Sequence, residues 1–181
     1  MQTRMGRGWM LGAAALAGAM LVGPQAQAQQ SNGLDDPTIV AIFDAANTWD
    51  IASGNLAAKK GTTKAIRDFG AQLARDHTNV RQQARDLAAK LHVTPTPPKD
   101  FAMAKSNAEA ERTLHATKGM AFDRAFLQHE VDFHKAVIDA LNTTFLPAIQ
   151  NAELKALVEK VVPVFNAHMV MAQHLLDGLG K

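Results

Sequence analysis

The sequence predicts an all-α protein, a four-helix bundle in which a long crossover containing an extra helix joins the second and third helices. Apolar residues recur at steps of three and four along four long segments, which places them on one side of a helix. No stretch of useful length alternates polar and apolar residues, so strands are not expected. The connections between the segments are short, long and short, as in an antiparallel bundle with one crossover.

The composition fits one domain and excludes several classes of function. The chain has 181 residues, of which 47% are hydrophobic and 20% charged, enough to bury a core. It has no Cys, which rules out disulfides, thiolate metal sites and a cysteine nucleophile. The net charge is +2, but without Arg4 and Arg7 the chain has 17 basic and 17 acidic residues. A balanced chain is not expected to bind nucleic acid.

Residues 1–28 have the three-part pattern of a secretory signal peptide. Two arginines precede an uncharged apolar run from Trp9 to Val22, and Ala26-Gln27-Ala28 supplies a signal peptidase site. The run is too short for the alternative, a membrane anchor, which needs about 20 residues. We therefore expect cleavage after Ala28. The mature protein is then expected to be periplasmic, with association with the outer membrane left open, and to have no membrane span. Residues 29–36 are expected to form a disordered leader, and residues 37–180 the bundle domain.

The first two helices are expected over residues 37–60 and 62–91. Pro37 suits the first turn of a helix, and Gly61 can end the first helix in a tight turn. The second segment has an almost unbroken stripe in steps of three and four, formed by Ile66, Phe69, Leu73, His77, Val80, Ala84, Leu87 and Leu91.

The last two helices of the bundle are expected over residues 120–141 and 152–179. The third is apolar on two sides, with Phe122 and Phe126 on one and Leu127 and Val131 on the other. The fourth carries a stripe of Leu154, Val158, Val161, Phe165, His168, Ala172, Leu175 and Leu179.

The long crossover covers residues 92–119. It begins with a proline-rich stretch that cannot be helical and continues as a weaker helix over residues 101–118. The stretch 142–151 joins the third and fourth helices. This order of connections is that of the ferritin-like bundles.

Several polar residues stand at matching places along the four helices and resemble a known family. They are Asp50, the Phe69…Asp76-His77 step, Phe122-Asp123…His134 and Pro163…His168. The set resembles the exported bacterial family known as domain of unknown function 4142, often labelled predicted outer membrane protein. The resemblance covers about residues 38–179 and implies a ferritin-like bundle. Asp50 departs from the family, which usually has Glu there, and the family has no established biochemical role.

A metal site is one hypothesis for these side chains. His77 and His168 each occupy a place in an otherwise apolar stripe, and His134 and Asp50 fall among apolar positions of the other two helices. Three imidazoles and one carboxylate, one from each helix, can bind a divalent transition metal inside a bundle. Without thiolates, the ligand set favours zinc, copper or iron.

Buried His–Asp pairs that fix the helix register are the favoured alternative. At about 1.5 Å per residue, His134 lies about 12 Å from the end of its helix and His168 at least about 24 Å along the next. Straight helices would then keep these two histidines more than about 10 Å apart. Asp123 would come level with His168 instead, as its hydrogen-bond partner, as an alternative ligand or as a residue that holds a ligand in place. Asp76 is also nearby.

Other chemistries fit less well. No Glu-Xaa-Xaa-His sequence occurs, which argues against a di-iron ferroxidase, and there is no Gly-Xaa-Ser-Xaa-Gly turn for a hydrolase. The sequence His168-Met169-Xaa-Met171-Xaa-Xaa-His174 has copper-type ligands, but one helix cannot direct all of them to one ion.

The sequence thus favours a non-catalytic exported bundle, an envelope-associated binding or structural module with an unknown protein or envelope partner and no certain cofactor. The alternative is a periplasmic protein that binds zinc, copper or iron at Asp50, His77, His134 and His168. The second apolar side of the third helix leaves a homodimer open.

Overall fold

The computed structural model describes residues 34–180, which form helices and connecting turns without strands. The five predicted helices are present within two residues of their expected ends. The predicted signal peptide lies outside the described residues, as does the leader up to residue 33. The helices are α1 (Asp36–Lys60), α2 (Lys64–Lys90), α3 (Ala102–Ala116), α4 (Gly119–Ala140), the π-helix η1 (Leu141–Phe145), α5 (Leu146–Ala148) and α6 (Ala152–Gly178).

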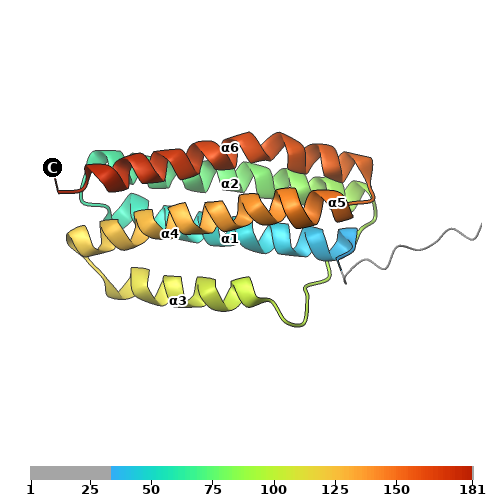
Figure 1. Cartoon of the computed structure of the whole chain (residues 1–181), viewed down its shortest axis with the longest axis horizontal. Helices are drawn as coiled ribbons and strands as arrows, with labels where there is room; N and C mark the ends of the chain where they lie inside the picture. The colour runs from blue at the N-terminus through green and yellow to red at the C-terminus, as the bar shows by residue number, and fades with distance from the viewer. Residues whose placement is uncertain (1–33, 181) are drawn as a thin grey trace, which may run out of the picture. The chain divides into compact units, whose positions relative to one another are not determined.

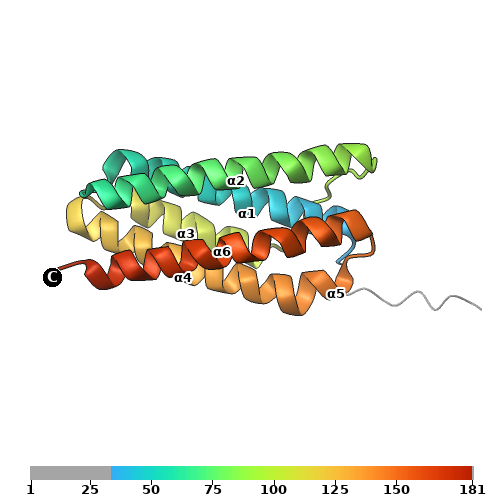
Figure 2. The ribbon, with the colours of Figure 1, turned by 90° about the horizontal axis from the view of Figure 1, so that it is seen from above.

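The long helices α1, α2, α4 and α6 lie side by side along a common direction (Figures 1 and 2). The tight turn at Gly61 makes α1 and α2 antiparallel, and α4 and α6 are antiparallel as well. The crossover runs back along the molecule as α3, so α2 and α4 point the same way (Figure 1). Helix α3 packs on the outside of the group, against α1 and α4.

The N-terminus of α1 corrects the prediction of a disordered leader up to residue 36. The Asp35 side chain accepts a hydrogen bond from the backbone N–H of Thr38 at 2.9 Å, which caps the first turn. The Asp36 carboxylate accepts from the backbone N–H groups of Gln150 and Asn151, both at 2.9 Å. These two residues therefore belong to the folded domain.

Helices α1 and α2 approach each other closely at two glycines. A methyl group on Gly54 would lie 2.6 Å from the carbonyl oxygen of Gly70 and 2.9 Å from the backbone nitrogen of Ala74. Backbone atoms cannot move aside as a flexible side chain can. The absence of a side chain at Gly54 therefore sets how near the two helices come.

Helix α4 ends at Ala140, close to its predicted end, but the helical path does not stop there. The π-helix η1 and the short helix α5 continue α4 as far as Ala148, in line with it (Figure 1). Leu141 and Phe145 on this extension and Ile149 just beyond it are buried. Burial of these side chains explains why the helical path continues through a segment that contains Pro147.

The core consists of two apolar groups with a polar cluster between them. One group is centred on Ile39, Phe43 and Phe165, and the other on Phe69 and Phe126, with neighbours from all four long helices. Ten polar or charged side chains among the described residues are buried, and seven of them contribute to the site described below. No helix of the described residues is both long and apolar enough to cross a membrane.

Candidate metal centre

Each of the four long helices contributes to a buried polar cluster near the middle of the bundle. Asp50 comes from α1, His77 from α2, Glu130 and His134 from α4, and His168 from α6, all of them at most 3% exposed. Their side chains face inward because each occupies a core-facing place in the three-and-four stripe of its helix.

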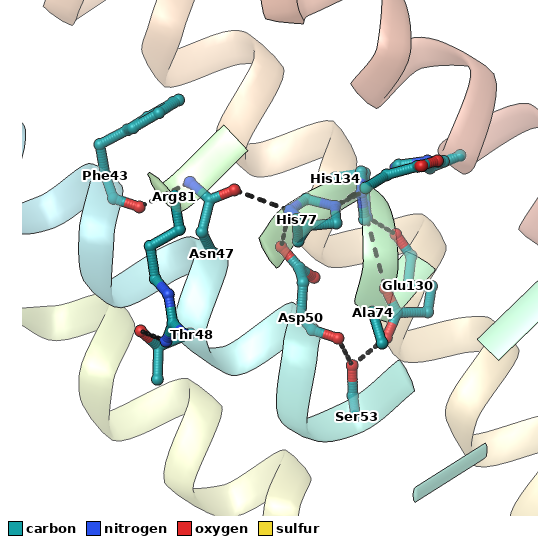
Figure 3. Close-up of polar contacts among 12 residues, drawn as sticks. Phe43, Asn47, Thr48, Asp50, Ser53, Ala74, His77, Arg81, Glu130 and His134 are labelled. Atoms are coloured by element: carbon teal, nitrogen blue, oxygen red, sulfur yellow. Dashed lines mark hydrogen bonds and ion pairs between the residues drawn. The ribbon is translucent and has the colours of Figure 1, made fainter. Parts of the chain in front are cut away.

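The three histidines turn one ring nitrogen each toward a common point. Nε2 of His77 lies 3.2 Å from Nδ1 of His168 and 3.4 Å from Nε2 of His134. Ligand atoms of all three residues lie within 4.8 Å of one another. Figure 3 shows His77 and His134 meeting in this way, with Asp50 and Glu130 beside them.

The outward-facing nitrogen of each histidine has an oxygen acceptor. Nδ1 of His134 lies 3.0 Å from the backbone carbonyl oxygen of Glu130, and Nε2 of His168 lies 3.0 Å from a carboxylate oxygen of Asp76. Since these oxygens accept, both ring nitrogens are N–H donors. The inner nitrogens, Nε2 of His134 and Nδ1 of His168, then carry lone pairs.

His77 is oriented by Asn47 in the same manner. The Asn47 amide nitrogen donates to the carbonyl oxygen of Phe43 at 2.7 Å, which turns the amide oxygen toward His77 (Figure 3). Nδ1 of His77 donates to that oxygen at 2.9 Å and lies 3.3 Å from Oδ2 of Asp50. Its Nε2, at the centre of the cluster, therefore carries a third lone pair.

Burial keeps the imidazoles of His77 and His134 neutral. Desolvation lowers the pKa of His134 to about 3, with a further lowering by His168. Desolvation, followed by the neighbouring His134 and His168, also lowers the pKa of His77 well below its ordinary value. The 3.3 Å contact between His77 and Asp50 is thus a polar contact of an uncharged imidazole and not an ion pair.

Asp50 and Glu130 form a buried carboxyl pair next to the histidines. Oε1 of Glu130 accepts from the Ser53 hydroxyl at 2.7 Å, but Oε2 of Glu130 and Oδ1 of Asp50 have no hydrogen-bond donor. Burial raises the pKa of Glu130 to about 8, and burial together with Glu130 raises that of Asp50 well above its ordinary value. Without a cation, Glu130 therefore holds a proton at neutral pH.

The predicted separation of His134 and His168 is wrong. The helical path of α4, η1 and α5 ends at Ala148, roughly 21 Å beyond His134. His168 lies about 24 Å from the start of α6. The two side chains are therefore level. The expected partnership of His168 with Asp123 is also wrong, because the buried Asp123 accepts hydrogen bonds from the backbone and hydroxyl of Thr62.

The structure divides the predicted ligand set in two. His77, His134 and His168 come together, whereas Asp50 lies on the far side of the His77 ring and contacts its Nδ1. The copper-type sequence on α6 is split, because His168 points into the cluster while Met171 and His174 are exposed.

Three residues of the site, Asn47, Ser53 and Glu130, were not predicted. Glu130 could have been found, because it lies four residues before His134 and so shares its side of α4. Asn47 and Ser53 could have been found in the same way, because each lies three residues from Asp50 and so shares its side of α1.

A comparison with protein families assigns the chain. The family model described as Domain of unknown function (DUF4142) matches residues 21–175. The chain is a member of the DUF4142 family. The match contains every residue of the cluster in this DUF4142 domain. Searches of curated proteins and of solved structures found no match.

Proposed function

We propose that this protein binds one divalent transition-metal ion, of the zinc, copper or iron type, at His77, His134 and His168. The observation that carries the proposal is the convergence of three buried imidazole nitrogens, each on a ring whose other nitrogen has an oxygen acceptor. Such a group is unfavourable without a ligand, because three lone pairs face one another in a buried space. A metal ion is the ligand that accepts all three.

The distances fit a metal of this class. Two nitrogens at about 2.0–2.1 Å from a tetrahedral ion lie about 3.3–3.4 Å apart. The contacts of His77 with His168 and His134 are 3.2 and 3.4 Å. Each ring also donates its other N–H to an oxygen, which is how proteins hold metal-binding histidines in position.

The carboxyl groups supply the charge that a buried dication needs. Asp50 and Glu130 each have one oxygen without a donor, and both are almost completely buried. An ion at the neutral imidazoles brings two positive charges, which favours ionisation of this pair and offsets the cost of burying the charge.

Three protein ligands leave a coordination position of a tetrahedral ion open. A bound ion in this state supplies a Lewis acid or an exchangeable metal. The chain's own contribution is to hold the three rings, to exclude water and to provide the nearby carboxyl groups.

Metal analysis of the purified protein tests the proposal. We expect about one ion per chain in the wild type and in His115→Ala, which alters an exposed histidine on α3. We expect loss of the ion in His77→Ala and in His168→Gln, with circular dichroism to show that each variant is helical. Equal metal content in His77→Ala and the wild type, or no uptake of zinc, copper or iron by the wild type, would contradict the proposal.

We also infer that the bundle is ferritin-like and exported. The parallel α2 and α4, joined by a crossover, and the antiparallel pairs α1–α2 and α4–α6 support the ferritin-like connectivity. The sequence pattern of residues 1–28 supports export. N-terminal sequencing of protein from the periplasm should begin at Gln29, and an intact Met1 would contradict cleavage.

A further inference from the structure

A groove between α2 and α6 leads from the surface to the histidine cluster. It has a volume of about 320 Å³ and is lined by Gln72, Asp76, Pro163, Ala167, His168 and Met171, among others. Of these residues His168 belongs to the cluster, and Asp76 is its hydrogen-bond partner.

Aromatic rings cover the cluster on other sides. Phe165 stacks on His77 with ring centroids 5.0 Å apart and packs edge-on against His134 at 5.9 Å. His77 and His134 are each 1% exposed. The Asp76 side chain, in contrast, is 33% exposed while it holds Nε2 of His168. The contact of Asp76 with His168 thus links solvent directly to the cluster.

We propose that a divalent metal ion enters and leaves the cluster through this groove, with Asp76 as its first contact and the His168 ring as the group that moves. This inference rests on the proposed function. The His168 ring stands between the groove and the centre, with Nε2 toward Asp76 and Nδ1 toward His77. Turning it breaks one hydrogen bond to a partly exposed carboxylate and alters the ring contacts of His168 with Phe69, His77 and His134. It is the histidine of the cluster that lines the groove.

Two further features of the groove support this route. The partly exposed Asp76 carboxylate attracts a dication before any buried ligand is reached. Pro163 lines the groove five residues before His168 and has no N–H, so α6 lacks the hydrogen bond from residue 163 to the carbonyl oxygen of Glu159. The segment of α6 beside the moving ring is thereby less rigidly held than an uninterrupted helix.

The experiment is to fill the groove without touching a ligand. Ala167→Phe places a ring in it from an exposed position. Zinc uptake by the metal-free protein and zinc release to excess chelator are then measured by rapid mixing. We expect both rates to fall together by about tenfold or more, with unchanged affinity, because a blocked path raises one barrier for both directions. The control is Ala136→Phe, at an exposed alanine in a separate groove between α4 and α6, which should leave both rates unchanged.

A second variant keeps the proposal testable if Ala167→Phe does not fold. Asp76→Asn should slow zinc uptake at low ionic strength, and the difference from the wild type should shrink at about 1 M salt, where charges are screened. A role of Asp76 limited to orienting His168 would not give this salt dependence.

The outcomes separate this route from the proposed function. If the wild type binds one zinc ion and Ala167→Phe and Asp76→Asn exchange it at the wild-type rate, the route is wrong and the metal site stands. If Ala167→Phe lowers affinity without slowing uptake, the route is also wrong. If the wild type binds no metal, the proposed function fails and the route fails with it.

Discussion

Replacing Glu130 by Gln tests the state of the buried carboxyl pair. Burial raises the pKa of Glu130 to about 8, from an ordinary value of 4.5. Between these pH values the folded chain holds a proton that the unfolded chain has released. The stability that Glu130 contributes is therefore fully present below about pH 4.5 and is lost as the pH rises through about 8.

The histidines act in a different pH window and in the opposite direction. The pKa of His134 is lowered to about 3, and that of His77 is also lowered. Their contribution to stability is complete above pH 6.5, the ordinary value of the imidazole, and is lost as the pH falls toward the folded pKa. Between pH 6.5 and 8, the carboxyl pair is therefore the part of the cluster whose protonation makes stability depend on pH.

The size of the effect follows from proton linkage. A group that is protonated only in the folded state lowers the free energy of unfolding by at most about 1.4 kcal/mol for each unit by which the pH rises. From pH 6.5 to 7.5, Glu130 should lower the free energy of unfolding of the metal-free wild type by about 1 kcal/mol, or the melting temperature by about 2–4 °C. In Glu130→Gln this contribution should disappear, because the amide is uncharged, can still accept from Ser53 and can donate to the free oxygen of Asp50.

Urea unfolding in the presence of chelator, at pH 6.5, 7.0 and 7.5, measures the difference. The control is Glu159→Gln, at an exposed glutamate on α6, which should follow the wild type. If Glu130→Gln loses stability between pH 6.5 and 7.5 as steeply as the wild type, Glu130 does not carry a proton in the folded chain and the reasoning is refuted.

Three further predictions concern the fold. Gly54→Ala should lower the free energy of unfolding by about 1–3 kcal/mol, because its methyl group meets backbone atoms. The control Gly178→Ala, with nothing within 4 Å, should not lower it, and equal melting temperatures of the two variants would contradict the prediction. Pro163→Ala should stabilise the protein by about 1–3 kcal/mol by restoring a helix hydrogen bond at an exposed position, and a lower melting temperature would be evidence against it. Lys60→Ala should destabilise the C-terminal end of α3 by about 1–3 kcal/mol, since the Lys60 ammonium donates to the carbonyl oxygens of Leu114 and Thr117 at 2.7 Å each. Unchanged hydrogen exchange in α3 would refute this.

The sequence by itself determined the helices and the inward orientation of the polar side chains. A helix repeats every 3.6 residues, so the stripes that contain His77 and His168 identify the side of each helix that is buried. Both histidines are buried in the structure, as are Asp50 and His134. This information is local, because the positions of a few neighbouring residues decide which way a side chain faces.

Only the tertiary structure decided which of these side chains meet. The position of His134 along the helix axis relative to His168 depends on where the helical path of α4, η1 and α5 ends. That end is set by the burial of Leu141 and Phe145 in a π-helix that periodicity does not predict. The pairing of Asp123 with Thr62 likewise depends on how the start of α4 packs beside the turn between α1 and α2. Contacts between helices depend on lengths and offsets accumulated over many residues, so a shift of a few residues in one helix end changes every partner along it.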